Sequence, residues 1–304
     1  IMRVVTSLRS DELVQWAGWG NIVRGPAPGV PTNATLGVGT LEGQFNVDNH
    51  GAASYSVALK IPPGRGGMEP RISLDYSSNG GNGPLGVGWL VSTGFPRSIT
   101  RGRSIQARDG TIRGVTFTAE DKYYLDGKRL LAVAGSDDTY RTEVESFMTI
   151  TAAVSGGNIE SFVAADKEGR RFTFGKYPGE NDGYQKGRYG FQDEDTLAYA
   201  YALKHVEDTL GNSVHFKYHR VANENNALLG EYVLDEITYT GNEAEGVPAK
   251  GKVTFHYNTK LVAGQYERFD RNVRFLANRT FAHSSRLDSI NVRFDGSRVG
   301  YYAV

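Results

Sequence analysis

Histidines are the side chains of this sequence best able to bind a metal ion or to transfer a proton. Two of them, His215 and His219, would share one face of a strand but lie about 13 Å apart. That separation is too large for one metal ion, and no H-E-x-x-H motif occurs. We therefore predict packed or solvated histidines and no metal site. The full set is His50, His205, His215, His219, His256 and His283.

Carboxylates gather in two places where they could act together. The segment FQDEDT, residues 191–196, has oxygen ligands that suit Ca²⁺ but lacks the spacing of a calcium-binding loop. We favour a solvated loop there and leave open an ion at residues 193–195. Glu143 and Glu145 would share one face of a strand predicted at 140–152 and could in principle form a glycosidase pair, but nothing else supports that site.

A nucleophilic serine would need a motif that presents it, and no G-x-S-x-G is present. The glycine-rich stretch GNGPLGVGW, residues 81–89, resembles a phosphate-binding loop only superficially. It lacks G-x-x-x-x-G-K-[ST], and no helix is predicted after it. The sequence thus predicts no catalytic, cofactor-binding or metal-binding residue, and a protein that is not an enzyme.

The same glycines predict a structural role. In PPGRGG, residues 62–67, the prolines fix φ near −65° and the glycines are free to adopt positive φ. This combination favours a rigid corner between strands. We expect Arg65 to brace nearby carbonyls or to pair with Glu69, and Trp89 to pack over glycines that leave room for its ring.

Composition excludes several classes of protein. The 304 residues include 38 glycines and no cysteine, so disulfides and thiolate chemistry are absent. Lys plus Arg equals Asp plus Glu at 34 each, which gives no basic excess for nucleic acid or for a membrane surface. No apolar run is long enough to insert into a bilayer, and the amino terminus lacks the apolar centre of a signal peptide. Because the chain begins with Ile and ends in YYAV within a strand pattern, we expect it to be part of a longer polypeptide.

The elements that would position these residues are almost all strands. Hairpins are predicted at 121–133 around Asp126-Gly127, at 160–175, and at 197–221 around a turn at 209–212. Further strands are predicted from SITRGRSIQ and GTIRGVTFT, within 98–118. We predict an all-β fold, an extended and curved antiparallel sheet of many hairpins, over residues 37–304. Residues 1–36 are predicted to be an irregular or helical lead-in with a proline-rich connector.

Several motifs resemble those of one family. They are GAASYS at 51–56, the PPGRGG turn, the strand LDYSS at 74–78, GNGPLGVGW at 81–89, YRTEVESF at 140–147, LKHVEDTLGNSVHFKY at 203–218 and RLDSINVR at 286–293. Together they resemble the amino-terminal region of SpvB-type proteins and of the B subunit (TcB) of insecticidal toxin complexes. The resemblance covers roughly residues 37–304.

In that family this region joins RHS-type repeats in a hollow β cocoon that encloses a carboxy-terminal toxin. The resemblance therefore implies a secreted, non-catalytic shell segment that is cytoplasmic before export. Its expected partners are the rest of its own polypeptide, namely the RHS repeats and the carboxy-terminal toxin, and a pore-forming translocation subunit. The ADP-ribosyltransferase activity of SpvB-type proteins belongs to a carboxy-terminal domain that this sequence does not contain.

The alternative is a secreted carbohydrate-binding or adhesin-like β module. Rows of aromatic residues could form a sugar platform, although such rows are more often core or cross-strand pairs. The rows are Tyr123 and Tyr124, Phe172 and Phe174, Tyr199 and Tyr201, Phe216 and Tyr218, and Phe255 and Tyr257. A self-closed barrel around an ordered ligand pocket would contradict the shell interpretation.

Overall fold

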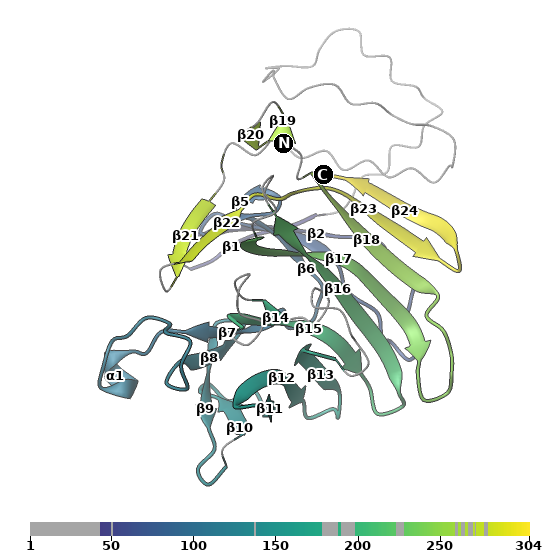
Figure 1. The fold of residues 1–304 in the computed structure, drawn as a ribbon. Helices are drawn as coiled ribbons and strands as arrows, with labels where there is room; N and C mark the ends of the chain where they lie inside the picture. Colours follow the sequence, from purple (N-terminus) through teal and green to yellow (C-terminus); the bar gives the residue numbers. More distant parts are fainter. Residues whose placement is uncertain are drawn as a thin grey trace.

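The fold is all-β and antiparallel, as the sequence predicted, with one four-residue helix, α1 (Gln106–Asp109), among the described residues (Figure 1). The computed structural model describes residues 43–49, 51–136, 138–177, 188–189, 198–222, 228–258, 261–262, 265–266, 270, 272–276 and 279–304. The predicted lead-in, 1–36, lies outside them. Within the described residues, no helix has the length and apolar character needed to span a membrane.

Eight strands close on themselves to form a barrel, which the sequence did not predict. Consecutive strands pair in antiparallel fashion, and the last strand of the ring pairs with both the first strand and the preceding one. The barrel strands are β7 (Ser98–Gly102), β8 (Lys122–Leu125), β9 (Lys128–Ala132), β10 (Thr139–Thr142), β11 (Thr149–Ser155), β12 (Asn158–Ala165), β13 (Arg171–Gly175) and β15 (Ala200–Glu207). Closure removes the unpaired edges that an open sheet would leave.

Strand β15 belongs to the barrel and also begins an open sheet. On one side its residues 200–202 pair with β7, and its residues 205–207 pair with the next hairpin strand, β16. On the other side residues 203–207 pair with β13. The open sheet continues through β16 (Asn212–Ala222), β17 (Leu228–Asn242), β18 (Gly251–Asn258), β23 (Arg286–Phe294) and β24 (Ser297–Ala303).

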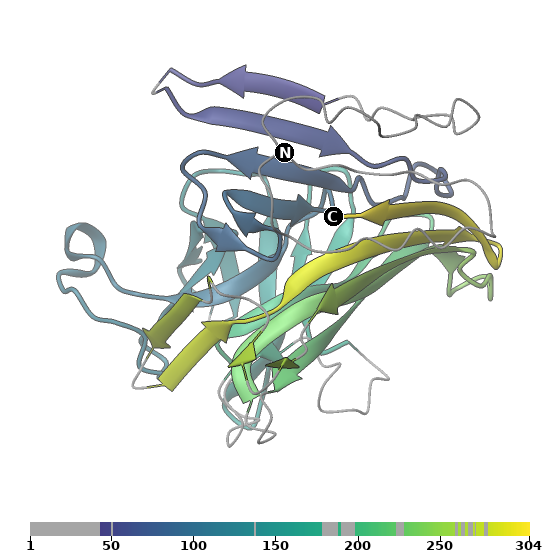
Figure 2. The ribbon, with the colours of Figure 1, turned by 90° about the horizontal axis from the view of Figure 1, so that it is seen from above.

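A separate four-stranded sheet lies beside the open sheet (Figure 2). Its strands, in spatial order, are β1 (Gly43–Val47), β2 (Ala53–Ala58), β3 (Ser73–Ser77) and β6 (Trp89–Ser92). The short pairs are β4 (Asn82–Gly83) with β5 (Gly86–Val87), β19 (Leu261–Val262) with β20 (Gln265–Tyr266), and β21 (Asn272–Leu276) with β22 (Arg279–His283), while β14 (Arg188–Tyr189) pairs with β15.

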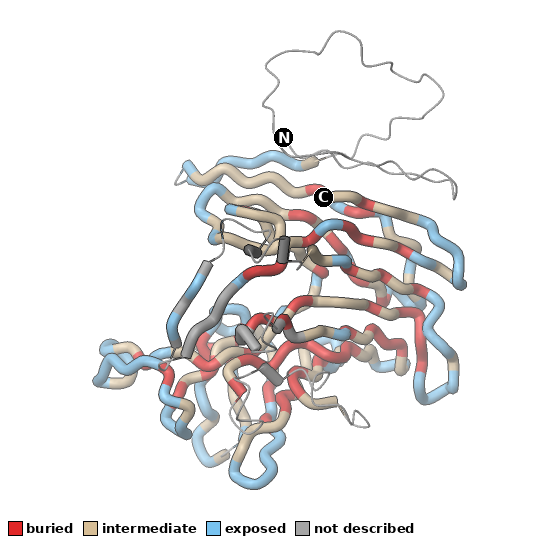
Figure 3. Tube along the Cα trace, turned by 45° about the horizontal axis from the view of Figure 1, so that its top comes forward, coloured by how far each residue is buried: buried red, intermediate tan, exposed pale blue. Residues whose placement is uncertain are grey.

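Side chains fill the barrel. Phe162 is fully buried and meets the rings of Tyr123 and Tyr201 in edge-to-face contacts, with centroids 5.2 and 5.0 Å away. Such contacts add to the free energy gained by burying the rings. Buried residues of the barrel strands, the open sheet and the four-stranded sheet belong to one cluster. Figure 3 shows buried stretches of the chain in all three parts. Among the described residues, the interior of the barrel is therefore packed with side chains.

The proline–glycine corner docks on the open sheet. The hydroxyl of Tyr239 donates to the Pro62 carbonyl at 3.0 Å, and the hydroxyl of Tyr302 accepts from the Lys60 N–H at 2.9 Å. Gly66 and Gly67 both have positive φ, as expected for this turn. Glu69 accepts a hydrogen bond from the Gly64 N–H at 2.9 Å, a different role from the predicted pairing with Arg65.

The three predicted hairpins are confirmed. Asp126 and Gly127 both have positive φ, as a two-residue turn between β8 and β9 requires. Two strand predictions were wrong. The segment 140–152 is divided between β10 and β11 by an irregular stretch, and the region after β7 contains α1 and loops in place of strands. In GNGPLGVGW the strands β4, β5 and β6 follow one another, and no helix follows the glycines.

Gly88 is a position in the glycine-rich loop where no side chain larger than hydrogen fits. Its φ is +82°, and a Cβ atom there would lie 2.5 Å from the ring of Tyr76 and 2.7 Å from the carbonyl oxygen of Ser77. Trp89 packs against Tyr76 as well, with ring centroids 5.3 Å apart. The glycine therefore makes room for Tyr76 and the backbone of β3, whereas the sequence predicted room for the Trp89 ring.

Replacing Gly88 with alanine should lower the free energy of unfolding by at least about 2 kcal/mol, because a left-handed conformation and a steric overlap are both imposed. The matched control is Gly81→Ala in the same loop, where a Cβ would meet nothing within 4 Å and φ is not positive. Urea unfolding of both variants measures the difference. Equal losses in the two variants would contradict this account of the loop.

Candidate functional site

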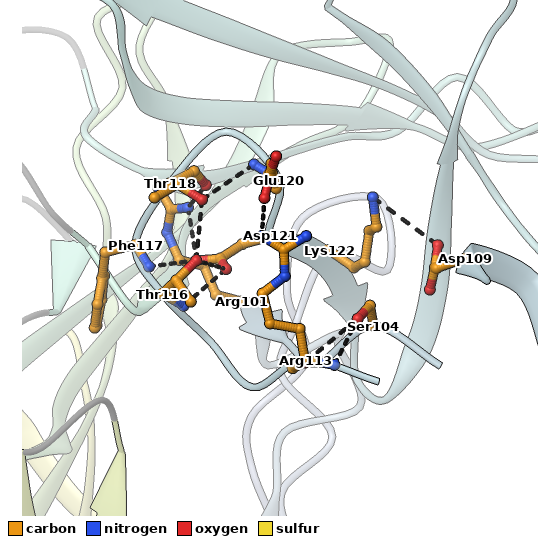
Figure 4. Close-up of polar contacts among 10 residues, drawn as sticks. All are labelled: Arg101, Ser104, Asp109, Arg113, Thr116, Phe117, Thr118, Glu120, Asp121 and Lys122. Carbon is orange, nitrogen blue, oxygen red and sulfur yellow. Dashed lines mark hydrogen bonds and ion pairs between the residues drawn. The ribbon is translucent and has the colours of Figure 1, made fainter. Parts of the chain in front are cut away.

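A polar hollow in the described surface lies beside the barrel, where the loop before β8 meets β7 and α1 (Figure 4). Its volume is about 230 Å³. The lining residues are Gly102, Ser104, Asp109, Thr111, Arg113, Gly114, Glu120, Asp121 and Lys122. Three carboxylates and two basic side chains in one small hollow make it the first candidate for a binding or catalytic site.

Asp121 organises the loop that forms one wall of the hollow. Its carboxylate accepts hydrogen bonds from the backbone N–H groups of Thr116 at 2.9 Å and Phe117 at 2.7 Å. It also pairs with the guanidinium of Arg101 at 3.2 Å, and both side chains are almost completely buried. Phe117 has a φ of +59°, so these bonds hold a conformation that its backbone rarely adopts. The carboxylate is occupied with stabilising this turn.

Asp109 has a similar role on the opposite wall. It pairs with the buried guanidinium of Arg129 and accepts a hydrogen bond from the Ile105 N–H at 2.8 Å. The hydrogen bond from Arg129, followed by that from Ile105, lowers the pKa of Asp109 from 3.8 to about 2. Lys122 lies 3.9 Å away. Asp109 is thus held ionised and links α1 to β8 and β9.

The polar side chains of the hollow bind other protein groups and do not form a catalytic arrangement. Ser104 Oγ accepts a hydrogen bond from the Arg113 N–H at 2.8 Å, and no histidine lines the hollow to act as its base. Glu120 pairs with Arg113 at the exposed rim. The ionic groups of the hollow therefore latch the loops to the barrel, and they do not form a nucleophile–base pair.

Residues considered as a glycosidase pair do not form one. Glu143 and Glu145 follow β10 in an irregular segment, so they do not share a strand face. Glu143 pairs with Arg108 of α1 at 2.7 Å, and Glu145 accepts a hydrogen bond from the Phe147 N–H. Both therefore have structural partners. The acidic segment 191–196 lies outside the described residues, as does His50.

The histidines are arranged differently from the prediction. His219 lies 3.6 Å from Asp235, and His256 is exposed. His215, however, is directly opposite His205 in the β15–β16 hairpin, with ring centroids 4.4 Å apart. Comparing His215 with His219 along one strand missed this cross-strand pair. Counting back from the turn predicted at 209–212 would bring 205 opposite 216. The observed register differs by one residue, with Glu207 opposite Ser213, and this difference places His205 opposite His215.

The aromatic rows proposed as a sugar platform are packing residues. Tyr123, Phe172, Phe174, Tyr201, Phe216 and Phe255 are buried, and Tyr124, Tyr199, Tyr218 and Tyr257 are half-buried. Burial raises the pKa of both Tyr218 and Tyr257 well above the ordinary value of 10.0. No exposed row of these rings remains for a glycan to stack on.

The closed barrel, the open sheet and the latched loops define an all-β domain with almost no helix among its described residues. Residues 47–145 match the family described as SpvB, Salmonella virulence plasmid 65kDa B protein. The resemblance to SpvB-type proteins is thereby confirmed over these residues.

Curated relatives share only a short segment with this chain. The mono(ADP-ribosyl)transferase SpvB of Salmonella choleraesuis (strain SC-B67) is 47% identical over 53 residues, which are 17% of this chain and 9% of that protein. The SpvB of Salmonella typhimurium (strain 14028s / SGSC 2262) is 51% identical over 43 residues, 14% of this chain and 7% of that protein. The match therefore spans less than a tenth of these relatives.

Solved structures share the fold over most of the chain. The crystal structure of TcdB2-TccC3 matches with a TM-score of 0.62 at 16% identity, over 83% of this chain and 14% of that one. The amino-terminal domain of the effector SpvB from Salmonella typhimurium strain LT2 matches with a TM-score of 0.58 at 17% identity, over 77% of this chain and 86% of that one. A Photorhabdus luminescens Tc holotoxin pore matches with a TM-score of 0.60 at 16% identity, over 80% of this chain and 13% of that one. At these identities the matches establish the fold.

Replacing Asp121 with alanine should lower the free energy of unfolding by about 3–5 kcal/mol, because a buried guanidinium and two backbone donors lose their acceptor. The matched control is Glu120→Ala, which removes an exposed ion pair worth at most about 1 kcal/mol. Chemical denaturation measures both. A loss below about 1 kcal/mol for Asp121→Ala would show that the latch contributes little.

Acid should weaken the Asp109 contact in a defined range. Because the folded pKa is below the ordinary value of 3.8, the stabilisation is fully present above about pH 4 and is lost as the pH falls toward 2. The urea midpoint of the wild type should therefore exceed that of Asp109→Asn at pH 5, and the difference should shrink between pH 4 and pH 2. A difference that stays constant over that range would contradict the assigned ion pair.

Proposed function

We propose that this chain is a non-catalytic wall segment of a larger toxin-complex or RHS-type polypeptide, in which a β shell encloses a carboxy-terminal toxic effector for delivery. The observation that carries the proposal is the combination of a filled barrel with a sheet that ends in an open edge at β24. A filled barrel supplies rigid wall material. An open edge supplies the place where further wall can be added by backbone pairing.

The edge has the geometry that strand addition needs. Within the described residues β24 pairs with β23 only, and the Val304 N–H donates to the Asp288 carbonyl at 2.9 Å. Because donor direction alternates along a strand, the N–H groups of Tyr301 and Ala303 point away from β23. Between these two residues in the chain, Tyr302 is buried, and its hydroxyl donates to the Lys60 carbonyl at 3.1 Å. The strand is thus held firmly while its outer edge is available.

The proposed shell role also implies binding partners and a cellular location for the protein. The partners would be the RHS repeats and toxin of the same polypeptide and a pore-forming translocation subunit, and the assembled protein would be secreted. Support comes from the fold shared with TcdB2-TccC3 and with a Tc holotoxin pore. Residues 37–304 would form one shell unit, with 1–36 as a lead-in.

The polar hollow also supports a non-catalytic role. Its carboxylates are bound to guanidinium and backbone groups, so they contribute to stability. The relatives named as transferases overlap this chain in 53 residues or fewer, and the structural match is with the amino-terminal domain of SpvB.

Proline at the outer edge of β24 should block strand addition with little effect on the fold. We expect the isolated chain to self-associate, or to bind the segment that follows it when the two are expressed separately. Ala303→Pro removes an outward N–H group and should reduce either association at least tenfold. Sedimentation velocity and co-purification measure it.

The matched control is Ala303→Ser, which keeps the N–H group and should associate as the wild type does. A wild-type chain that is a stable monomer and does not bind the following segment would contradict the proposed wall. So would association that is equally strong in Ala303→Pro.

A further inference from the structure

Three possible metal ligands converge where the barrel meets the open sheet. His205 on β15 and His215 on β16 are cross-strand neighbours, and Glu243 lies in the turn after β17. One ligand atom from each residue lies within 4.8 Å of the other two. His215 Nε2 is 3.1 Å from Glu243 Oε1. The hairpin register, together with the turn, brings these residues together from positions almost 40 apart in the sequence.

An unsatisfied nitrogen points to a ligand. His205 is 4% exposed, and its Nε2 atom is buried without a hydrogen-bond partner among the described residues. Buried polar atoms are nearly always satisfied, and one left alone costs about 1–3 kcal/mol. A bound cation would supply the missing partner.

Both imidazoles are held in the neutral form that metals require. Burial lowers the pKa of His205 to about 3, with further contributions from His215 and Arg171. Burial also lowers the pKa of His215, where Glu243 acts in the opposite direction and Lys204 and Lys217 add to the lowering. Burial and the facing ring both act against the charged form, which is the direction that leaves a lone pair for a cation.

Tyr177 covers the cluster. Its ring lies 4.5 Å from the ring of His205 and 5.6 Å from that of His215, measured between centroids. Its hydroxyl donates to Glu243 Oε2 at 3.2 Å. The Glu243 side chain is 63% exposed and can therefore move toward the histidines. The cluster has a carboxylate to offset the charge of a cation and an aromatic cover that limits access of water.

We propose that His205, His215 and Glu243 bind a zinc ion. Two imidazole nitrogens and one carboxylate oxygen form a ligand set that zinc accepts, with bonds of about 2.0–2.2 Å and a fourth position for water or another oxygen. The ligand atoms, which lie within 4.8 Å of one another, would draw together slightly around the ion. The ion would tie the barrel, through β15, to the turn between β17 and β18, and so fix the angle between barrel and open sheet.

The test is titration of the metal-stripped 304-residue chain with zinc chloride at pH 7, followed by isothermal calorimetry. We expect one zinc ion per chain, a stoichiometry that does not depend on whether the chains associate. The melting temperature should rise with zinc concentration, because a ligand that binds the folded state stabilises it. His215→Gln and Glu243→Gln should each weaken binding by more than the 10–100-fold typical of an outer-shell change.

Matched controls are His219→Gln, on the same strand as His215, and Glu245→Gln, in the same turn as Glu243; both should bind zinc as the wild type does. Far-ultraviolet circular dichroism without zinc checks that every variant is folded. X-ray absorption of the wild-type complex should show two imidazole ligands at about 2.0–2.1 Å. Absence of binding, binding that persists in both ligand variants, or an absorption spectrum without imidazole scattering would each overturn the proposal.

Discussion

The double-sided pairing of β15 is the constraint on which the rest of the structure depends. This one strand closes the barrel by pairing with β7 and β13, and it starts the open sheet by pairing with β16. Nearly every residue from Ala200 to Val206 is buried, because each face and each edge of the strand is covered. A change in its register by one residue would exchange its two faces and would break both assemblies at once. The bulge near Lys204 marks the point where the strand leaves one set of partners for another.

Everything proposed for the chain follows from this junction. The barrel is filled by rings such as Phe162 and Phe174, so it acts as a rigid body. The open sheet extends that body and is backed by the four-stranded sheet through the anchoring hydroxyls of Tyr239 and Tyr302. The His205–His215 pair lies on the hairpin that leaves the junction. A cation there would stiffen the connection between a closed part of the wall and a part that continues.

The sequence was sufficient to predict the local hairpins, but it did not predict that distant strands close into a barrel. The hairpin at Asp126-Gly127 could be predicted because its turn chemistry is local. Barrel closure depends on β15 pairing with β7, where Ala200 lies opposite Thr100, far away in the sequence. Alternation of side chains along a strand does not encode such a distant pairing. The same limit explains the missed site. The predicted hairpin brings His205 and His215 onto neighbouring strands but one residue out of register, and Glu243 joins them only through the fold of β17. The loop latch of Asp121 was missed because a buried aspartate has no distinctive spacing in the sequence.

Whether a following strand extends the open sheet at β24 can be measured by amide hydrogen exchange, compared between this chain alone and the longer polypeptide proposed to contain it. We predict fast exchange for the N–H groups of Tyr301 and Ala303 in the isolated chain at concentrations where it is monomeric. In the longer polypeptide the same groups should be strongly protected, because a following strand accepts their hydrogen bonds. Equally fast exchange in both would mean that β24 is a true end of the sheet, and it would contradict the view of this chain as a wall that its own polypeptide continues.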